Sequence, residues 1–264
     1  MKRITGTFWQ VMFLALLCLA PRAFAQTVDV TSAGSFVYDG DYVSPYYATV
    51  NGVPSTTVIC DDFADTTTLN TTWSANVTQF SNLSSSLGNT VWGAYYTSQK
   101  VASTTIIDWY KEAAWLTLQL LAQPSGSNNQ AWYSYAEWAV FDPNSVLSWL
   151  KTHGSGGGAD TAACEAIFGN ACTSTTASAG SFLYNAEQNY AKGNYSNFLI
   201  LSPTVNGTVC SPFISGSGNC PAQEFFEIVP EGGTAAMYLL LAAVSCLGAM
   251  LFRSRRQNAR VGTA

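Results

Sequence analysis

The sequence predicts an α+β fold: an antiparallel β-rich region with a central helical segment, followed by one C-terminal transmembrane helix. Residues 27–80 are rich in Thr, Val, Tyr and Phe and contain two turn signals, which favours short strands. Residues 104–122 have the apolar spacing of an amphipathic helix. Residues 234–252 contain no charged side chain, and a helix of that length would span roughly 28 Å, close to the thickness of a bilayer core.

The strands are expected around the two turn signals and near the C-terminal end of the β-rich region. Asp39-Gly40 and Asn51-Gly52 lie between short apolar runs, and Asn-Gly in that position is typical of a tight hairpin. We expect strands at residues 35–38, 46–50, 56–59, 73–79, 198–201 and 225–229.

The helices are expected in the middle of the chain. In residues 104–122 Asp108 favours the positive N-terminal end, and Pro124 ends the helix. Further helices are expected at residues 129–141, 145–151 and 177–192.

The first 25 residues have the three parts of a secretory signal peptide. Two basic residues precede an apolar run at residues 8–20, and residues 23–25 supply the small-x-small cleavage pattern. We therefore expect signal peptidase to cut before Gln26, so that residues 26–228 form an extracytoplasmic ectodomain.

The other end has the features of a membrane anchor. Arginines, including Arg253, Arg255 and Arg256, follow the uncharged residues 234–252, and basic residues at one end of a span face the cytoplasm. We expect the protein to be anchored in the inner membrane until it is processed, with residues 257–264 as a cytoplasmic tail.

The predicted ectodomain is strongly acidic. Residues 29–231 contain all 16 acidic residues but four of the 11 basic residues, a net charge of −12. Such a surface repels nucleic acid and anionic headgroups. We therefore expect no nucleic-acid partner, whereas neutral glycans, cations and basic partners are compatible with this charge.

The residues before the anchor, Val229, Pro230, Glu231 and Gly232, resemble the PEP-CTERM protein-sorting signal when they are taken together with residues 234–252 and the arginines that follow. The usual pattern has a second proline where this chain has Gly232. The resemblance covers residues 229–256. It implies processing by an exosortase-like enzyme, release to the cell surface or extracellular matrix, and exopolysaccharide as a partner.

Five of the seven cysteines lie in the predicted ectodomain. Exported cysteines meet oxidising conditions, so disulfides are expected. Short loops separate Cys164 from Cys172 and Cys210 from Cys220, which makes these pairs the disulfide candidates, although spacing does not prove connectivity. Cys60 has no partner in these pairs. It is therefore expected to be a buried thiol, a link between chains or a reactive group.

The chain contains no recognisable catalytic or metal-binding set. His153 is the single histidine, which argues against imidazole catalysis and zinc, and the carboxylates near Cys60 lack the spacing of a calcium loop. We expect no catalytic residue, no metal and no cofactor. By elimination, the candidates for a carboxylate-dependent glycan hydrolase are Glu112, Glu137 and Asp142.

Aromatic residues are frequent, and polysaccharide-binding faces use such rings for stacking. Helical spacing favours core packing for most of them. Residues 91–96, which carry few charges, are expected to be the exposed exception.

Three segments also resemble thioester adhesin domains: residues 59–63, residues 112–116 and residues 136–142. In those domains an early cysteine joins the glutamine of a Gln-x-Ala-x-Trp setting, and the resulting bond captures a surface amine. Cys60, Ala136 and Trp138 match the pattern. Ser134 stands where glutamine is expected, and Gln130 is the nearest upstream glutamine.

Together these features predict an exported, C-terminally sorted cell-surface or matrix protein. It would not be an enzyme and would act by adhesion or by association with exopolysaccharide. The alternatives are a thioester-type covalent adhesin that uses Cys60 and a secreted glycan hydrolase.

Overall fold

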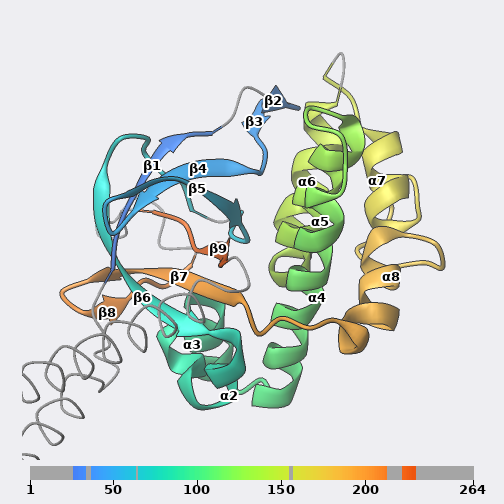
Figure 1. Cartoon of the computed structure of the whole chain (residues 1–264). Helices are drawn as coiled ribbons and strands as arrows, with labels where there is room; N and C mark the ends of the chain where they lie inside the picture. The colour runs from blue at the N-terminus through green and yellow to red at the C-terminus, as the bar shows by residue number, and fades with distance from the viewer. Residues whose placement is uncertain (1–25, 34–36, 64, 155–156, 213–221, 230–264) are drawn as a thin grey trace, which may run out of the picture.

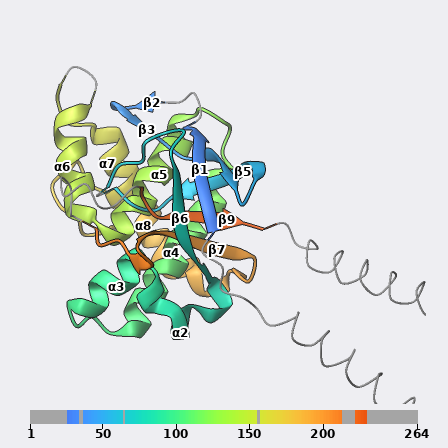
Figure 2. The same cartoon turned by 90° about the vertical axis from the view of Figure 1, so that its left-hand side faces the viewer.

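The protein consists of a β-barrel with a layer of helices beside it (Figure 1). In Figure 2, turned by 90°, the barrel strands lie in front of the helices. The computed structural model describes residues 26–33, 37–63, 65–154, 157–212 and 222–229.

Six antiparallel strands close the barrel in the order β6-β1-β4-β5-β9-β7, because β7 pairs back onto β6. A closed sheet leaves no long strand edge exposed for pairing with another chain. β8 extends β7, and β2 and β3 form a separate hairpin. The strands are β1 (Gln26–Ser32), β2 (Val37–Tyr38), β3 (Asp41–Tyr42), β4 (Tyr46–Val50), β5 (Val53–Cys60), β6 (Thr72–Gln79), β7 (Phe198–Val205), β8 (Thr208–Val209) and β9 (Phe225–Ile228).

Two-residue turns with positive φ connect the hairpins. Asn51-Gly52 joins β4 to β5 with φ angles of 49° and 79°, and Asp39-Gly40 joins β2 to β3 with φ angles of 49° and 94°. Asn, Asp and Gly tolerate this conformation, which matches the twist of paired strands. The hairpin predicted at Asn51-Gly52 is therefore confirmed.

The helices follow β6 in the sequence, and most of them form a layer against one side of the barrel. Their ends are capped by side chains: Ser127 accepts a hydrogen bond from Gln130 N at the start of α5, and Asp142 accepts one from Ser145 N at the start of α6. The helices are α2 (Leu83–Ser86), α3 (Val91–Ser98), α4 (Ser103–Leu121), α5 (Asn128–Phe141), α6 (Pro143–His153), α7 (Thr161–Phe168) and α8 (Phe182–Asn189).

The predicted α+β architecture, a β-rich region with a helical segment at its centre, is wrong. The strands form a closed barrel, helices α4 to α8 form a layer beside it, and α2 and α3 lie at another side of the barrel (Figure 1). Closure depends on β7 and β9, which follow the whole helical layer in the sequence. Local residue patterns do not reveal which distant strands pair.

The transmembrane helix predicted at residues 234–252 lies outside the described residues. Within the described ranges, no helix has both the length and the apolar character that crossing a membrane requires.

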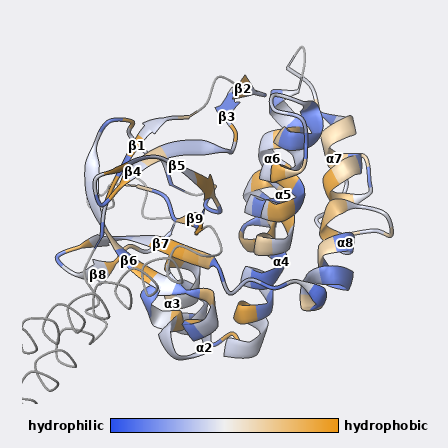
Figure 3. Cartoon of the chain, in the orientation of Figure 1, coloured by the Kyte–Doolittle hydropathy of each residue, from blue (hydrophilic) through white to orange (hydrophobic). Residues whose placement is uncertain are grey.

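Buried side chains fill the space between the barrel and the helices. One group joins Phe225 of β9 to Trp138 of α5 and Leu150 of α6. A second group joins Phe226 of β9 to Tyr110 of α4. Figure 3 shows hydrophobic residues on β7 and on α7. The ends of β5 and β9 therefore lie against α5, and this contact positions the site.

Candidate ligand-binding site

A pocket of about 460 Å³ opens where the β2–β3 hairpin, the loop after β5 and helices α5 and α6 meet. We call it the aromatic pocket, because five of its lining residues are aromatic: Tyr42, Tyr46, Phe63, Trp138 and Trp149. Its polar lining residues are Asp41, Asp65, Thr66, Thr67 and Gln223.

The β2–β3 hairpin forms one wall of this pocket. A Cβ at Gly40, which has a φ of 94°, would lie 3.8 Å from Cζ2 of Trp149, so the turn reaches α6. Tyr46 donates a hydrogen bond to the carbonyl of Tyr42 at 2.6 Å. Tyr42 itself is 52% exposed, which leaves its ring at the rim.

The deeper rings hold one another in place. The centroid of the Phe63 ring lies 5.1 Å from that of Trp138 and 5.9 Å from that of Trp149. On its other side Trp149 stacks on His153, with centroids 3.5 Å apart and planes 4° from parallel. Rings fixed in this way offer apolar faces to a ligand at little cost in conformational entropy.

Two carboxyls and one amide supply the polar groups. Burial raises the pKa of Asp41, and burial also raises the pKa of Asp65. Gln223 is held by two hydrogen bonds: its amide nitrogen donates to the carbonyl of Asp62 at 2.6 Å, and its main-chain N–H donates to Thr67 Oγ1 at 2.9 Å. The pocket thus combines ring faces with groups that bond hydroxyls.

Cys60 lies behind this pocket at the end of β5, fully buried and outside any disulfide. Its carbonyl accepts a hydrogen bond from Nε1 of Trp138 at 2.8 Å, and its thiol donates to the carbonyl of Asp62 at 3.1 Å. Burial, followed by the charge of Asp62, raises the pKa of the Cys60 thiol well above its usual value. Because the thiolate is the nucleophile, burial of this cysteine in its protonated form disfavours its reaction.

The structure does bring Cys60 close to the position where a thioester domain has its glutamine. The main-chain N–H of Cys60 donates to Ser44 Oγ at 3.0 Å, and the N–H of Ser44 donates to Ser134 Oγ at 3.1 Å. Gln130 lies near the start of α5, where its side-chain oxygen accepts from Gly126 N at 2.9 Å. A serine hydroxyl has no amide to exchange with the thiol, so this geometry does not favour a thioester.

A buried pair of carboxyls lies next to Cys60. Glu224 accepts hydrogen bonds from Val91 N and Tyr110 Oη, each at 2.6 Å, and from the hydroxyl of Ser202. The main-chain N–H of Asp61 donates to the carbonyl of Glu224 at 3.3 Å, and burial, followed by the charge of Glu224, raises the pKa of Asp61 well above its usual value. Burial therefore favours the protonated form of Asp61.

Only two of the three predicted hydrolase candidates share a cavity. Glu137 is buried in the core, where Thr117 donates to it at 2.8 Å and burial raises its pKa. Glu112 and Asp142 line a different cavity together with Glu187. In the described part of the chain, no group of three or more His, Cys, Asp or Glu residues is placed to hold a metal ion.

The other predicted residues lie away from the aromatic pocket. Cys164 and Cys172 form the expected disulfide, with an S–S distance of 2.03 Å. Cys210 is buried after β8, and its predicted partner Cys220 lies outside the described residues. Val229 donates to the carbonyl of Asn197 at 2.9 Å. The remaining residues of the sorting signal, Pro230, Glu231, Gly232, Arg253, Arg255 and Arg256, also lie outside the described residues.

The expectation that residues 91–96 are exposed is wrong. Val91 and Trp92 are fully buried, and Tyr95 and Tyr96 are partly buried. The exposed ring at the aromatic pocket is Tyr42, whose signal in the sequence is its place directly after the Asp39-Gly40 turn and Asp41.

The fold and site define a β-barrel protein with a helical layer and an aromatic pocket between the two. No protein-family model matches the chain, no curated protein matches it, and no solved structure matches it.

Proposed function

We propose that this protein is an exported, non-enzymatic cell-surface or matrix protein that binds a neutral polysaccharide in the aromatic pocket. The convergence of five aromatic rings with two carboxyls and one amide around about 460 Å³ carries the proposal. Aromatic rings stack on the apolar faces of sugars, and carboxylate and amide groups bond their hydroxyls. The volume lies in the range of small-molecule sites.

The charge of the chain supports a neutral ligand. Residues 29–231 carry a net charge of −12, which disfavours anionic polymers such as nucleic acid and acidic glycans. The carboxyls of Asp41 and Asp65 in the pocket also disfavour an anionic ligand.

Tyr42→Ala is expected to weaken oligosaccharide binding about tenfold, the loss for one ring contact of about 1.4 kcal/mol. Tyr47→Ala is the matched control, because Tyr47 is a 43% exposed tyrosine on β4 that does not line the pocket. Binding of the full-length protein to a panel of neutral oligosaccharides checks this. An equal loss of oligosaccharide affinity in the two variants would contradict a binding site in the aromatic pocket.

Sorting is the second part of the proposal, and the resemblance of residues 229–256 to PEP-CTERM signals supports it. Deleting residues 229–260 is expected to abolish retention in the cell envelope and to release the protein into the medium. Immunoblots of envelope and medium fractions check this. Unchanged retention of the truncated protein would rule out a C-terminal sorting signal.

A further inference from the structure

A second cavity, of about 620 Å³, lies among α3, α4, the junction of α5 and α6, and α8. We call it the acid-lined pocket. The residues that matter in it are three carboxyls and three aromatic rings: Glu112, Asp142, Glu187, Tyr95, Tyr96 and Trp109.

Asp142 gives the clearest sign that this pocket is built for a ligand. It is 7% exposed, and its Oδ1 accepts from Ser145 N at 3.2 Å to cap α6. Its Oδ2 is buried and has no hydrogen-bond partner among the described residues. Leaving a buried carboxylate oxygen without a donor is costly, so a ligand that supplies one would be stabilised there.

The rings of the pocket are held edge to face. The centroid of the Tyr96 ring lies 4.9 Å from that of Tyr95 and 4.9 Å from that of Trp109. Tyr96 donates its hydroxyl proton to the carbonyl of Phe141, which fixes the ring beside Asp142. The faces of such rings carry negative potential and attract cations.

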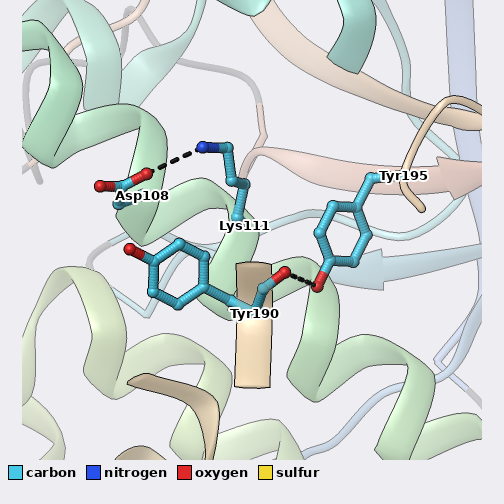
Figure 4. A network of polar contacts seen from close by, with 4 residues as sticks. All are labelled: Asp108, Lys111, Tyr190 and Tyr195. Atoms are coloured by element: carbon cyan, nitrogen blue, oxygen red, sulfur yellow. Dashed lines mark hydrogen bonds and ion pairs between the residues drawn. The ribbon is translucent and has the colours of Figure 1, made fainter. Parts of the chain in front are cut away.

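A neighbouring side chain already shows this chemistry. Nζ of Lys111 lies 2.8 Å from Oδ1 of Asp108 and 5.8 Å from the centroid of the Tyr190 ring (Figure 4). An ammonium group on α4, the helix that contributes Glu112 and Trp109 to the pocket, is thus held by a carboxylate of the same helix and by the ring of Tyr190, which follows α8.

We propose that the acid-lined pocket binds an organic ammonium group, with its carboxyls neutralising the charge and its rings packing on the attached carbons. This site is separate from the aromatic pocket and does not depend on the proposed polysaccharide binding. The same chemistry is presented by the free amine of a deacetylated amino sugar and by a quaternary amine, and the experiment distinguishes these two sources.

Binding of a quaternary amine, whose charge does not change with pH, should strengthen between about pH 6 and pH 8. Burial, followed by the charges of Glu187 and Asp108, raises the pKa of Glu112 to about 7. An ammonium ligand favours the ionised carboxylate, so affinity increases as Glu112 loses its proton. The titratable and charged groups around Glu112 are Asp108 and Lys111 on α4, Tyr95 and Tyr96 on α3, Asp142, Glu187 on α8 and Tyr190.

Calorimetric titration of the full-length protein with two matched pairs of ligands tests the proposal. The first pair is choline and its uncharged isostere 3,3-dimethylbutan-1-ol, and the second is a glucosamine trisaccharide and its fully N-acetylated form. We expect each charged ligand to bind at least about tenfold more tightly than its neutral counterpart. The ratio between the two charged ligands shows whether the pocket prefers a quaternary amine or an amino sugar.

The variants Glu112→Gln and Asp142→Asn are each expected to weaken ammonium binding about tenfold, whereas Glu165→Gln, which removes an exposed carboxylate on α7, should not. Asparagine also caps helices, so Asp142→Asn keeps α6 intact. Three outcomes overturn the proposal: no saturable binding up to about 10 mM, equal affinity for charged and neutral ligands, or affinities that all three variants reduce equally.

Discussion

Replacing Trp138 by alanine is expected to lower the free energy of unfolding by about 3–5 kcal/mol. The side chain is 2% exposed and packs against Phe63 and Tyr135, with ring centroids 5.1 and 4.9 Å away. Its Nε1 is the donor to the buried carbonyl of Cys60. Alanine would therefore leave both a cavity and an unpaired carbonyl at the contact between β5 and α5.

Trp138→Phe separates these two contributions. Phenylalanine keeps much of the packing but removes the donor, so we expect a loss of about 1–3 kcal/mol. Urea unfolding followed by circular dichroism measures both variants, with the exposed Tyr47→Ala expected to change stability by less than about 0.5 kcal/mol. An unfolding midpoint for Trp138→Ala equal to that of the wild type would contradict the packing described for this contact.

The protein is expected to be more stable at pH 5 than at pH 7 because of its buried carboxyls. In the unfolded chain Asp61 and Glu224 ionise near about pH 4. In the folded protein burial, and then the charge of Glu224, raises the pKa of Asp61, and burial raises the pKa of Glu224. The folded state therefore binds more protons above pH 4. For each proton that only the folded state retains, the free energy of unfolding falls by about 1.4 kcal/mol for every pH unit above about pH 4.

Asp61→Asn should make this pH dependence shallower by about 1.4 kcal/mol per pH unit, because it removes one retained proton. Asparagine has nearly the same shape as aspartate, which limits the structural change. Unfolding free energies at several pH values between about 5 and 7 measure the slope, and Glu165→Gln is the control for general charge repulsion. An unchanged slope in Asp61→Asn would show that Asp61 is ionised in the folded protein.

Local patterns were sufficient for the elements whose signals are local. The Asn51-Gly52 hairpin follows from residues that tolerate positive φ, and α4 follows from its apolar spacing. Barrel closure could not be predicted from local patterns, since β7 and β9 pair with strands that are distant in the sequence.

The site was predictable only in part. Cys60 and Ser134, the two positions that the resemblance to thioester domains compares, are linked in the structure through Ser44. The aromatic pocket was missed, since Tyr42, Phe63, Trp149 and Gln223 come from four separate segments that only the tertiary fold brings together. Glu224 was also missed, although an acidic residue directly before the apolar pair Phe225-Phe226 was a signal for a buried carboxyl.

The most direct test of the proposed function is a crystal structure of the protein with the neutral oligosaccharide that it binds most tightly. The proposal predicts a sugar ring stacked on Tyr42 or Trp149, with hydroxyls bonded to Asp41, Asp65 or Gln223. A fully occupied oligosaccharide on another face of the protein, with the aromatic pocket empty, would contradict it.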